Sequence, residues 1–145
     1  MPDFYDFALA NSRLPELRQT LLSLRALKSE VATLRDRIVE LNAPQAVAGA
    51  VASASGAPAR AEIDAETQRL RMRMQGLVDQ MIATVAEIDS WHIQLREIES
   101  GLVDFPALVA GRPVWLCWRL GEDEVAWWHE VSTGFDGRQR MEDLV

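Results

Sequence analysis

The sequence predicts an α+β protein in which an antiparallel pair of long helices, a helical hairpin, precedes a small antiparallel sheet of two to three strands. Two observations predict this fold. Apolar residues recur every three or four positions up to about residue 90, which is the period of a helix. After Trp91 apolar and polar residues alternate, which is the period of a strand. The length of 145 residues fits a single domain.

The two helices are expected over residues 13–42 and 62–91. One apolar stripe comprises Leu17, Leu21, Leu24, Leu27, Val31, Leu34, Ile38 and Leu41, and the other comprises Ile63, Leu70, Met74, Leu77, Met81, Val85 and Ile88. Two successive three-residue steps in the first stripe interrupt its heptads, which favours a helix pair over a long regular coiled coil. Pro15 lies either in the first turn or inside a helix that begins at Asp6 and that it would kink.

Residues 43–61 connect the helices and are rich in Ala, Gly, Ser and Pro, with almost no charge. This composition predicts a flexible tether. The segment is longer than a helical hairpin needs to close, so a functional lid is the alternative.

The β region is expected over residues 92–135, with residues 136–145 as a C-terminal tail. HIQLREI (92–98) alternates as a strand does, and GLVDFP (101–106) is predicted to be a turn and an extended segment, because the residue before proline avoids the helical conformation. The alternating runs 114–120 and 125–131 flank the sequence GEDE and predict a hairpin.

An even-numbered hairpin loop would put Val114, Leu116, Trp118 and Leu120 on one apolar face with Val131, His129, Trp127 and Val125. This face, including Trp118 and Trp127, is predicted to pack on the helices. The other face would pair Cys117 with Trp128, and its candidate binding residues are Trp115, Trp128, Arg119 and Glu130. Tryptophan side chains on a half-polar face predict that this face is covered by the C-terminal tail, by a second copy of the chain or by a partner.

The net charge is −7, and all of it comes from residues 86–145. Because the tryptophan-rich end is acidic, a nucleic-acid-binding surface is not expected. The N-terminus does not resemble a signal peptide, no apolar run approaches the ~20 residues of a membrane helix, and Cys117 has no partner for an internal disulfide. We therefore expect a cytoplasmic protein without membrane contact.

Three ordered segments, GLVDFPAL, VWLCWRLGEDEVAWWHE and TGFDGR, closely resemble the C-terminal signature of a bacterial family of unknown function. The early ANSRLPELR resembles the N-terminal segment of that family. The resemblance implies a bacterial protein with a helical region followed by a short β region, and it implies no activity. The family pattern has a glycine near His92 and an aspartate near Glu97, so a site that used the aspartate would here depend on Glu97.

The candidate polar pair is Asp104 and His129, because a carboxylate beside an imidazole can orient a general base or a metal ligand. The alternative is a buried histidine with one hydrogen bond and an aspartate that caps a turn. His129, Asp104 and Glu97 are weak metal candidates. Cys117 is not expected to share an ion with His129, since the predicted register puts them on opposite faces, and its mid-strand position makes it a poor nucleophile.

The leading hypothesis is a non-enzymatic structural or interaction module that self-associates or binds a protein partner, with no cofactor predicted. The alternative is a small-ligand or metal-binding domain that uses Asp104 and His129. A third hypothesis is an enzyme that uses the same pair, with Arg119 or Arg112 holding an anion. No catalytic residues are assigned.

Overall fold

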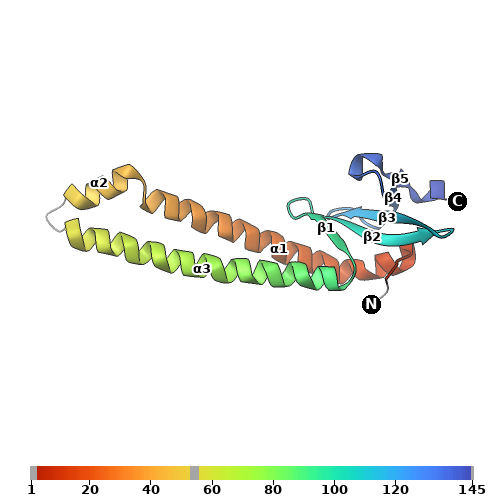
Figure 1. The fold of residues 1–145 in the computed structure, drawn as a ribbon, viewed down its shortest axis with the longest axis horizontal. Coiled ribbons are helices and arrows are strands. Elements are labelled where there is room, and N and C mark those ends of the chain that lie inside the picture. The colour runs from red at the N-terminus through yellow and green to blue at the C-terminus, as the bar shows by residue number, and fades with distance from the viewer. Residues whose placement is uncertain (1–2, 53–55, 145) are drawn as a thin grey trace. The chain divides into compact units, whose positions relative to one another are not determined.

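The computed structural model describes residues 3–52 and 56–144 and confirms the α+β class (Figure 1). Three helices precede an antiparallel sheet in this part of the chain. The helices are α1 (Phe7–Leu41), α2 (Pro44–Ala52) and α3 (Gly56–Ser90); the strands are β1 (Gln94–Glu97), β2 (Leu102–Val109), β3 (Arg112–Arg119), β4 (Trp127–Glu130) and β5 (Gln139–Arg140), and short 3-10 turns are η1 (Phe135–Gly137) and η2 (Met141–Leu144).

Helix α1 begins six residues before the predicted position 13. The reason is a side-chain cap: the carboxylate of Asp6 accepts a hydrogen bond of 2.7 Å from the backbone N–H of Leu9. Pro15 therefore lies inside the helix, which is the second of the two predicted placements. No helix in the described part of the chain is both long enough and apolar enough to cross a membrane.

The predicted tether, residues 43–61, is largely helical. Helix α2 occupies Pro44–Ala52, and α3 begins at Gly56, while residues 53–55 lie outside the described part. The prediction gave too much weight to Gly and Ser and too little to Ala, which has the highest helix propensity. Pro44 also favours a helix here, because a proline is well placed at the first helical position.

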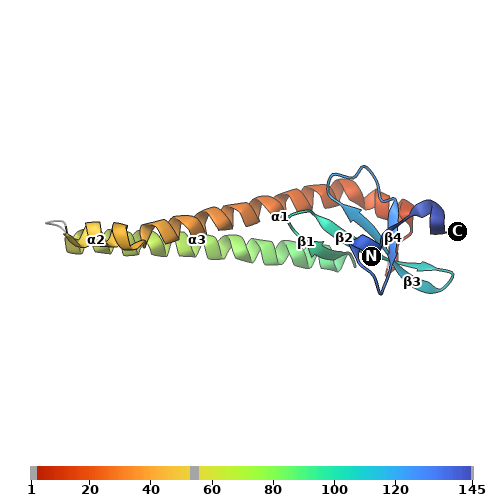
Figure 2. The ribbon, with the colours of Figure 1, turned by 90° about the horizontal axis from the view of Figure 1, so that it is seen from above.

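The structure divides into two compact units. The helical unit, residues 26–82, pairs the later turns of α1 with most of α3 in the antiparallel arrangement predicted for the hairpin (Figure 2). Its described buried side chains are Leu34, Thr67 and Leu77. Across the two helices, Asn42 donates a hydrogen bond to Thr67 (2.9 Å) and Arg73 pairs with Glu30 (2.5 Å).

The second unit, here the sheet unit, contains residues 1–25 and 83–145. Within the described residues its sheet has five antiparallel strands in the order β1-β2-β3-β4-β5, two more than the predicted maximum. One reason is that GLVDFP continues as β2 and turns tightly into β3. Ala110 and Gly111 both have positive φ (49° and 78°), as two-residue hairpin turns require. The other is that the tail adds β5 beside β4.

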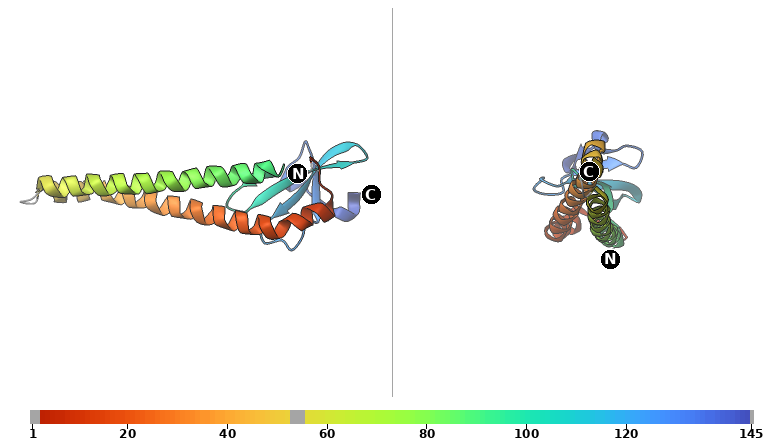
Figure 3. Two further views of the ribbon diagram at one scale, coloured as in Figure 1. Left: turned by 90° about the horizontal axis from the view of Figure 1, so that it is seen from below. Right: turned by 90° about the vertical axis from the view of Figure 1, so that its left-hand side faces the viewer.

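The helix face of the sheet is mainly apolar and packs on the first half of α1 and on the segment before it (Figure 3). Its buried side chains are Val103, Phe105, Val114, Leu116 and Trp118. Tyr5 contacts Phe105 edge to face, with ring centroids 5.1 Å apart, and the guanidinium of Arg18 lies 5.7 Å from the centroid of the Trp118 ring. The prediction that Trp118 belongs to the core is therefore confirmed.

The predicted register of β3 and β4 is wrong by one residue. Trp115 pairs with His129, Leu116 with Trp128, and Cys117 with Trp127. The connection between Arg119 and Trp127 contains an odd number of residues, because β4 does not begin until Trp127. Two hydrogen bonds hold this loop to α1: Val125 N–H donates to Asn11 Oδ1 (2.7 Å), and Asn11 Nδ2 donates to the Val125 carbonyl (3.3 Å). The slip moves His129 and Trp127 to the face opposite the helices, and Trp128 and Glu130 to the helix face.

Candidate metal centre

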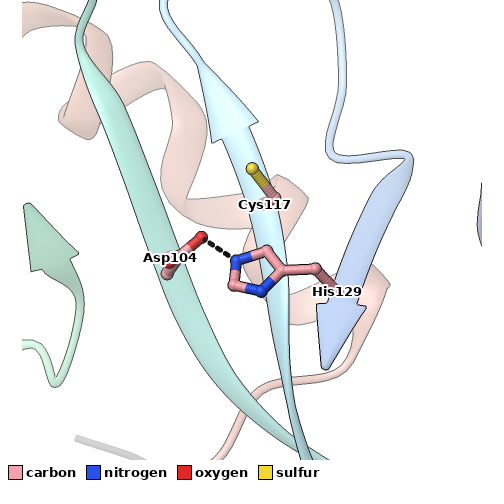
Figure 4. A group of neighbouring side chains, drawn as sticks. All are labelled: Asp104, Cys117 and His129. Atoms are coloured by element: carbon pink, nitrogen blue, oxygen red, sulfur yellow. Dashed lines mark hydrogen bonds and ion pairs between the residues drawn. The ribbon is translucent and has the colours of Figure 1, made fainter. Parts of the chain in front are cut away.

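Asp104, Cys117 and His129 come together on the site face, the face of the sheet opposite the helices (Figure 4). They belong to the neighbouring strands β2, β3 and β4. Asp104 pairs directly with Cys117, and the partner of His129 is Trp115, two positions from Cys117. All three are buried, and one potential ligand atom from each lies within 4.8 Å of the others. The structure thus confirms that the two members of the predicted pair are adjacent and adds a third.

The imidazole of His129 is held at both nitrogens. Nδ1 lies 2.8 Å from the backbone carbonyl oxygen of Glu130, and Nε2 lies 3.0 Å from Oδ1 of Asp104. A carbonyl oxygen only accepts, so Nδ1 carries a proton and donates it. In the neutral ring the lone pair of Nε2 then faces a carboxylate oxygen. A contact of this length is made by one proton, carried either by Nε2 or by the carboxyl of Asp104, or by a metal ion in place of that proton.

Arg96 fixes the other oxygen of Asp104. Its Nε donates to Oδ2 at 2.9 Å, and its guanidinium lies 5.0 Å from the centroid of the Trp115 ring. This reach follows from an irregularity in β1: Leu95 pairs with Val103 and Glu97 with Leu102, so Arg96 is an extra, unpaired residue. Such a bulge re-aims the side chain that it carries. Asp104 is therefore oriented from both sides before any ligand binds.

Cys117 carries a thiol that resists ionisation. Burial raises its pKa to about 12, and the charge of Asp104 acts in the same direction, as do Glu122 and a hydrogen bond to Asp104. Arg138 lowers the pKa, with an effect smaller than those of burial and Asp104 and larger than that of Glu122. A thiol with such a pKa is almost wholly protonated near neutrality and is a poor nucleophile. A metal ion in place of the proton would stabilise the thiolate, as coordination does for other thiols.

A cavity of about 360 Å³ opens onto the three side chains. Besides them, its lining includes Arg96, Trp115 and Thr133, and it is completed by Leu102, Val131, Gly134 and Phe135. The cavity gives the buried group a route to solvent. A metal ion there would have protein ligands on the sheet side and space for a further ligand on the cavity side.

The C-terminal tail covers part of the site face, as one of the predicted alternatives proposed. Arg138 lies 4.6 Å from the ring centroid of Trp127 and 4.5 Å from that of Phe135, and it pairs with Glu122 at 3.0 Å. Gly137 is required for this path, because a Cβ there would lie 2.6 Å from the Cβ of Thr133. Trp127, predicted to be core on the helix face, is instead half-buried beneath this tail.

The predicted binding residues do not form one surface. Trp115 is half-buried beside Arg96 on the site face, whereas Trp128 is buried on the helix face and donates from Nε1 to the Arg140 carbonyl (3.1 Å). Glu130 pairs with Arg112 on the helix face. Arg119 lies against Phe135, with its guanidinium 5.2 Å from the ring centroid.

Glu97, the third predicted metal candidate, is exposed and is not part of the group with Asp104 and His129. It lines, with Arg119, a second cavity of about 240 Å³ that shares Leu102 and Phe135 with the first. Its neighbour Arg96 contacts Asp104 instead.

Two residues of the site were not predicted, and each depends on local sheet geometry. Cys117 was excluded because an even-numbered loop would put it and His129 on opposite faces of the sheet. Only an odd-numbered loop puts them on the same face. Arg96 was missed although HIQLREI carries a signal of the bulge: its apolar residues Leu95 and Ile98 are three positions apart, where strict alternation needs an even step. The signal that could have found Cys117 is its pairing with Asp104, which follows if GLVDFP is a strand of the same sheet.

The donor set is one carboxylate oxygen, one imidazole nitrogen and one sulfur. This mixture suits Zn²⁺, which accepts Asp, His and Cys ligands, and it does not suit Mg²⁺ or Ca²⁺, which prefer oxygen. The hydrogen bond from Nδ1 to a backbone carbonyl is the arrangement that typically orients a metal-bound histidine.

A family model described as "Uncharacterized conserved protein (DUF2203)" matches residues 3–141. The search of curated proteins gave no match. The search of solved structures gave none either.

Proposed function

The chain belongs to the DUF2203 family of uncharacterized conserved proteins, and we propose that it is a metal-binding protein in which Asp104, Cys117 and His129 hold one Zn²⁺ ion. The cavity supplies the fourth position to water or to a small ligand.

The observation that carries the proposal is the orientation of His129. Its Nδ1 proton is engaged by a backbone carbonyl, so its Nε2 faces Oδ1 of Asp104 as a ligand atom would. The thiol of Cys117 lies in the same group. A buried imidazole held in this tautomer beside a carboxylate and a thiol has three donors of the kinds that zinc accepts.

The nitrogen and oxygen donors need little adjustment, whereas the sulfur, up to 4.8 Å from them, would have to approach by up to about 1 Å. Nitrogen and oxygen ligands about 2.1 Å from one tetrahedral ion lie about 3.4 Å apart. Nε2 and Oδ1 are 3.0 Å apart, so a movement of a few tenths of an ångström at either side chain suffices. Arg96 holds Oδ2, which leaves Oδ1 as the ligand oxygen.

The proton on the thiol of Cys117 makes Zn²⁺ binding dependent on pH. Its pKa of about 12 means that the ion must displace the thiol proton at any ordinary pH. The apparent affinity for Zn²⁺ should therefore rise at least about tenfold per pH unit between pH 6 and 8.

The test is titration of metal-free protein with Zn²⁺ and with Co²⁺. We expect one ion per chain, and the Co²⁺ form should show a sulfur-to-cobalt charge-transfer band. Cys117→Ser should lose that band, and Asp104→Asn and His129→Gln should weaken Zn²⁺ binding about 10- to 1000-fold, since each removes one of three ligands.

Matched controls are available for two ligands. His92→Asn changes the other histidine, which is exposed and has a φ of 60° that asparagine accepts, and Asp123→Asn changes an exposed loop carboxylate. Both should bind Zn²⁺ as the unmodified protein does. Failure of the unmodified protein to bind either ion, or equal losses in ligand and control variants, would contradict the proposal.

A second candidate function, self-association through the helical unit, is favoured by its incomplete burial. Large apolar side chains of this unit are exposed, among them Val39 (65%), Met72 (67%) and Ile82 (62%). In a dimer, each copy would cover these apolar side chains of the other. Light scattering after size exclusion should then report a dimer that Met72→Ser and Ile82→Ser shift toward monomer while the far-ultraviolet circular dichroism is retained; a monomer at all concentrations would contradict it.

A further inference from the structure

We propose that the cavity beside Asp104, Cys117 and His129 binds a small monocarboxylate with an apolar body, and that Arg96 holds its carboxylate. The part played by the metal in this proposal rests on the proposed function, whereas the part played by Arg96 does not.

The guanidinium of Arg96 is preorganised to donate hydrogen bonds to an anion. Its Nε is engaged by Asp104 and its plane lies over Trp115, so the orientation of the guanidinium is fixed. Within the described residues its terminal amino groups have no hydrogen-bond partner, its side chain is 42% exposed, and it lines the cavity. A guanidinium held in this way presents paired N–H groups that match a carboxylate.

The cavity walls select for an apolar body. Trp115 and Phe135 provide two aromatic surfaces, and Leu102 and Val131 add aliphatic ones. A volume of about 360 Å³ is near the lower end for small-molecule sites, so it suits a ligand of the size of one substituted ring.

The charges favour a single negative charge on the ligand. With Zn²⁺ bound, the thiolate of Cys117 and the carboxylate of Asp104 together balance the ion. Arg96 is then the unbalanced charge of this group, and one carboxylate neutralises it. Phosphate, which carries more charge near neutral pH and has no apolar body, fits less well.

The probe is benzoate, with benzamide as a neutral compound of the same shape and acetate as a carboxylate without the ring. Calorimetry should detect benzoate binding to the zinc-loaded protein and weaker binding to the metal-free protein. Benzamide should bind about 10- to 100-fold more weakly, because it lacks the charge that Arg96 recognises. Acetate should also bind more weakly, because it leaves the aromatic walls uncovered.

The variants isolate Arg96. Arg96→Gln should weaken benzoate binding about 10- to 100-fold and leave benzamide unchanged, while Arg96→Lys, which keeps the charge and loses the paired donors, should fall between. Arg112→Gln, on the helix face of the same sheet, removes the same charge and should have no effect. Melting temperatures would show that all variants fold.

The outcomes separate the two proposals. Benzoate binding that depends on Arg96 in a protein that takes up no Zn²⁺ would support the carboxylate site and refute the metal centre. Zn²⁺ binding by the three ligands, with no preference for benzoate over benzamide or no effect of Arg96→Gln, would overturn the carboxylate site alone.

Discussion

The two faces of the sheet are both covered, but by different kinds of contact. The helix face buries Val103, Phe105, Leu116 and Trp118 against α1, as an ordinary core does. The site face buries Asp104, Cys117 and His129, and its cover is the chain's own tail, held through Arg138. Buried titratable groups destabilise a fold unless they are paired, so their concentration on one face is a pointer to function rather than to stability.

This difference in packing also explains why a ligand can reach the site face and not the helix face. Trp118 is fully buried among apolar side chains, whereas a cavity opens beside Cys117, where aromatic rings contact arginines. Substitutions on the two faces should therefore separate stability from binding.

The largest effect is expected for Trp118→Ala on the helix face. This ring is fully buried and its Nε1 donates to the Glu122 carbonyl (3.1 Å), so its removal should lower the free energy of unfolding by about 3–5 kcal/mol. Urea denaturation measures the change. The matched variant is Trp127→Ala, because Trp127 is half-buried on the site face. It should lower the free energy of unfolding clearly less, and equal losses would contradict the distinction between the faces.

Asp104→Ala should lower the free energy of unfolding by about 3 kcal/mol in metal-free protein, because it leaves the buried His129 imidazole without its partner. A saturating concentration of Zn²⁺ about 100 times its Kd should add about 2.7 kcal/mol to the unmodified protein and almost nothing to the variant. Thermal unfolding with and without Zn²⁺ checks both. Asp123→Ala, in an exposed loop, should respond to Zn²⁺ normally.

The pKa of Cys117 predicts a loss of stability at alkaline pH in metal-free protein. Its ordinary value of 9.0 applies to the unfolded chain, and the folded value is about 12. Between these values the folded state keeps a proton that the unfolded state has released, so the free energy of unfolding should fall by about 1.4 kcal/mol per pH unit as pH rises. Urea titrations between pH 9 and 11 test this, and in Cys117→Ala the slope should be smaller by that amount.

The smallest effect is expected in the tail. Arg138→Gln removes the ion pair with Glu122 and the contacts with Trp127 and Phe135, and should lower the free energy of unfolding by about 1 kcal/mol. Proteolysis of the tail should accelerate while the far-ultraviolet circular dichroism is retained. An unchanged rate would show that Arg138 does not hold the cover in place.

The sequence predicts those features of the fold that follow from the spacing of apolar residues. It does not predict those that depend on a single hydrogen bond. The stripe containing Leu17, Leu21 and Leu24 does face the core, because helical spacing is a property of many residues together. The start of α1 depends on Asp6 alone, and the register of β4 depends on Asn11. Neither contact leaves a repeated pattern.

The candidate site was predictable in part. Asp104 and His129 could be proposed from residue type, because a carboxylate beside an imidazole can orient a general base or a metal ligand. Cys117 and Arg96 were missed, because the first depends on the parity of a loop and the second on a bulge. A one-residue error in register was enough to move Cys117 away from His129.

The clasp between Asn11 and Val125 constrains how the loop before β4 can change in length through evolution. Because Asn11 holds Val125, a residue added or removed before Val125 changes only the loop and leaves the register of β4 intact. A residue added or removed between Val125 and Trp127 would turn every side chain of β4 over and replace His129 on the site face with a neighbour. Lineages that keep the site should therefore vary in loop length only before Val125, and Asn11 should persist wherever His129 does.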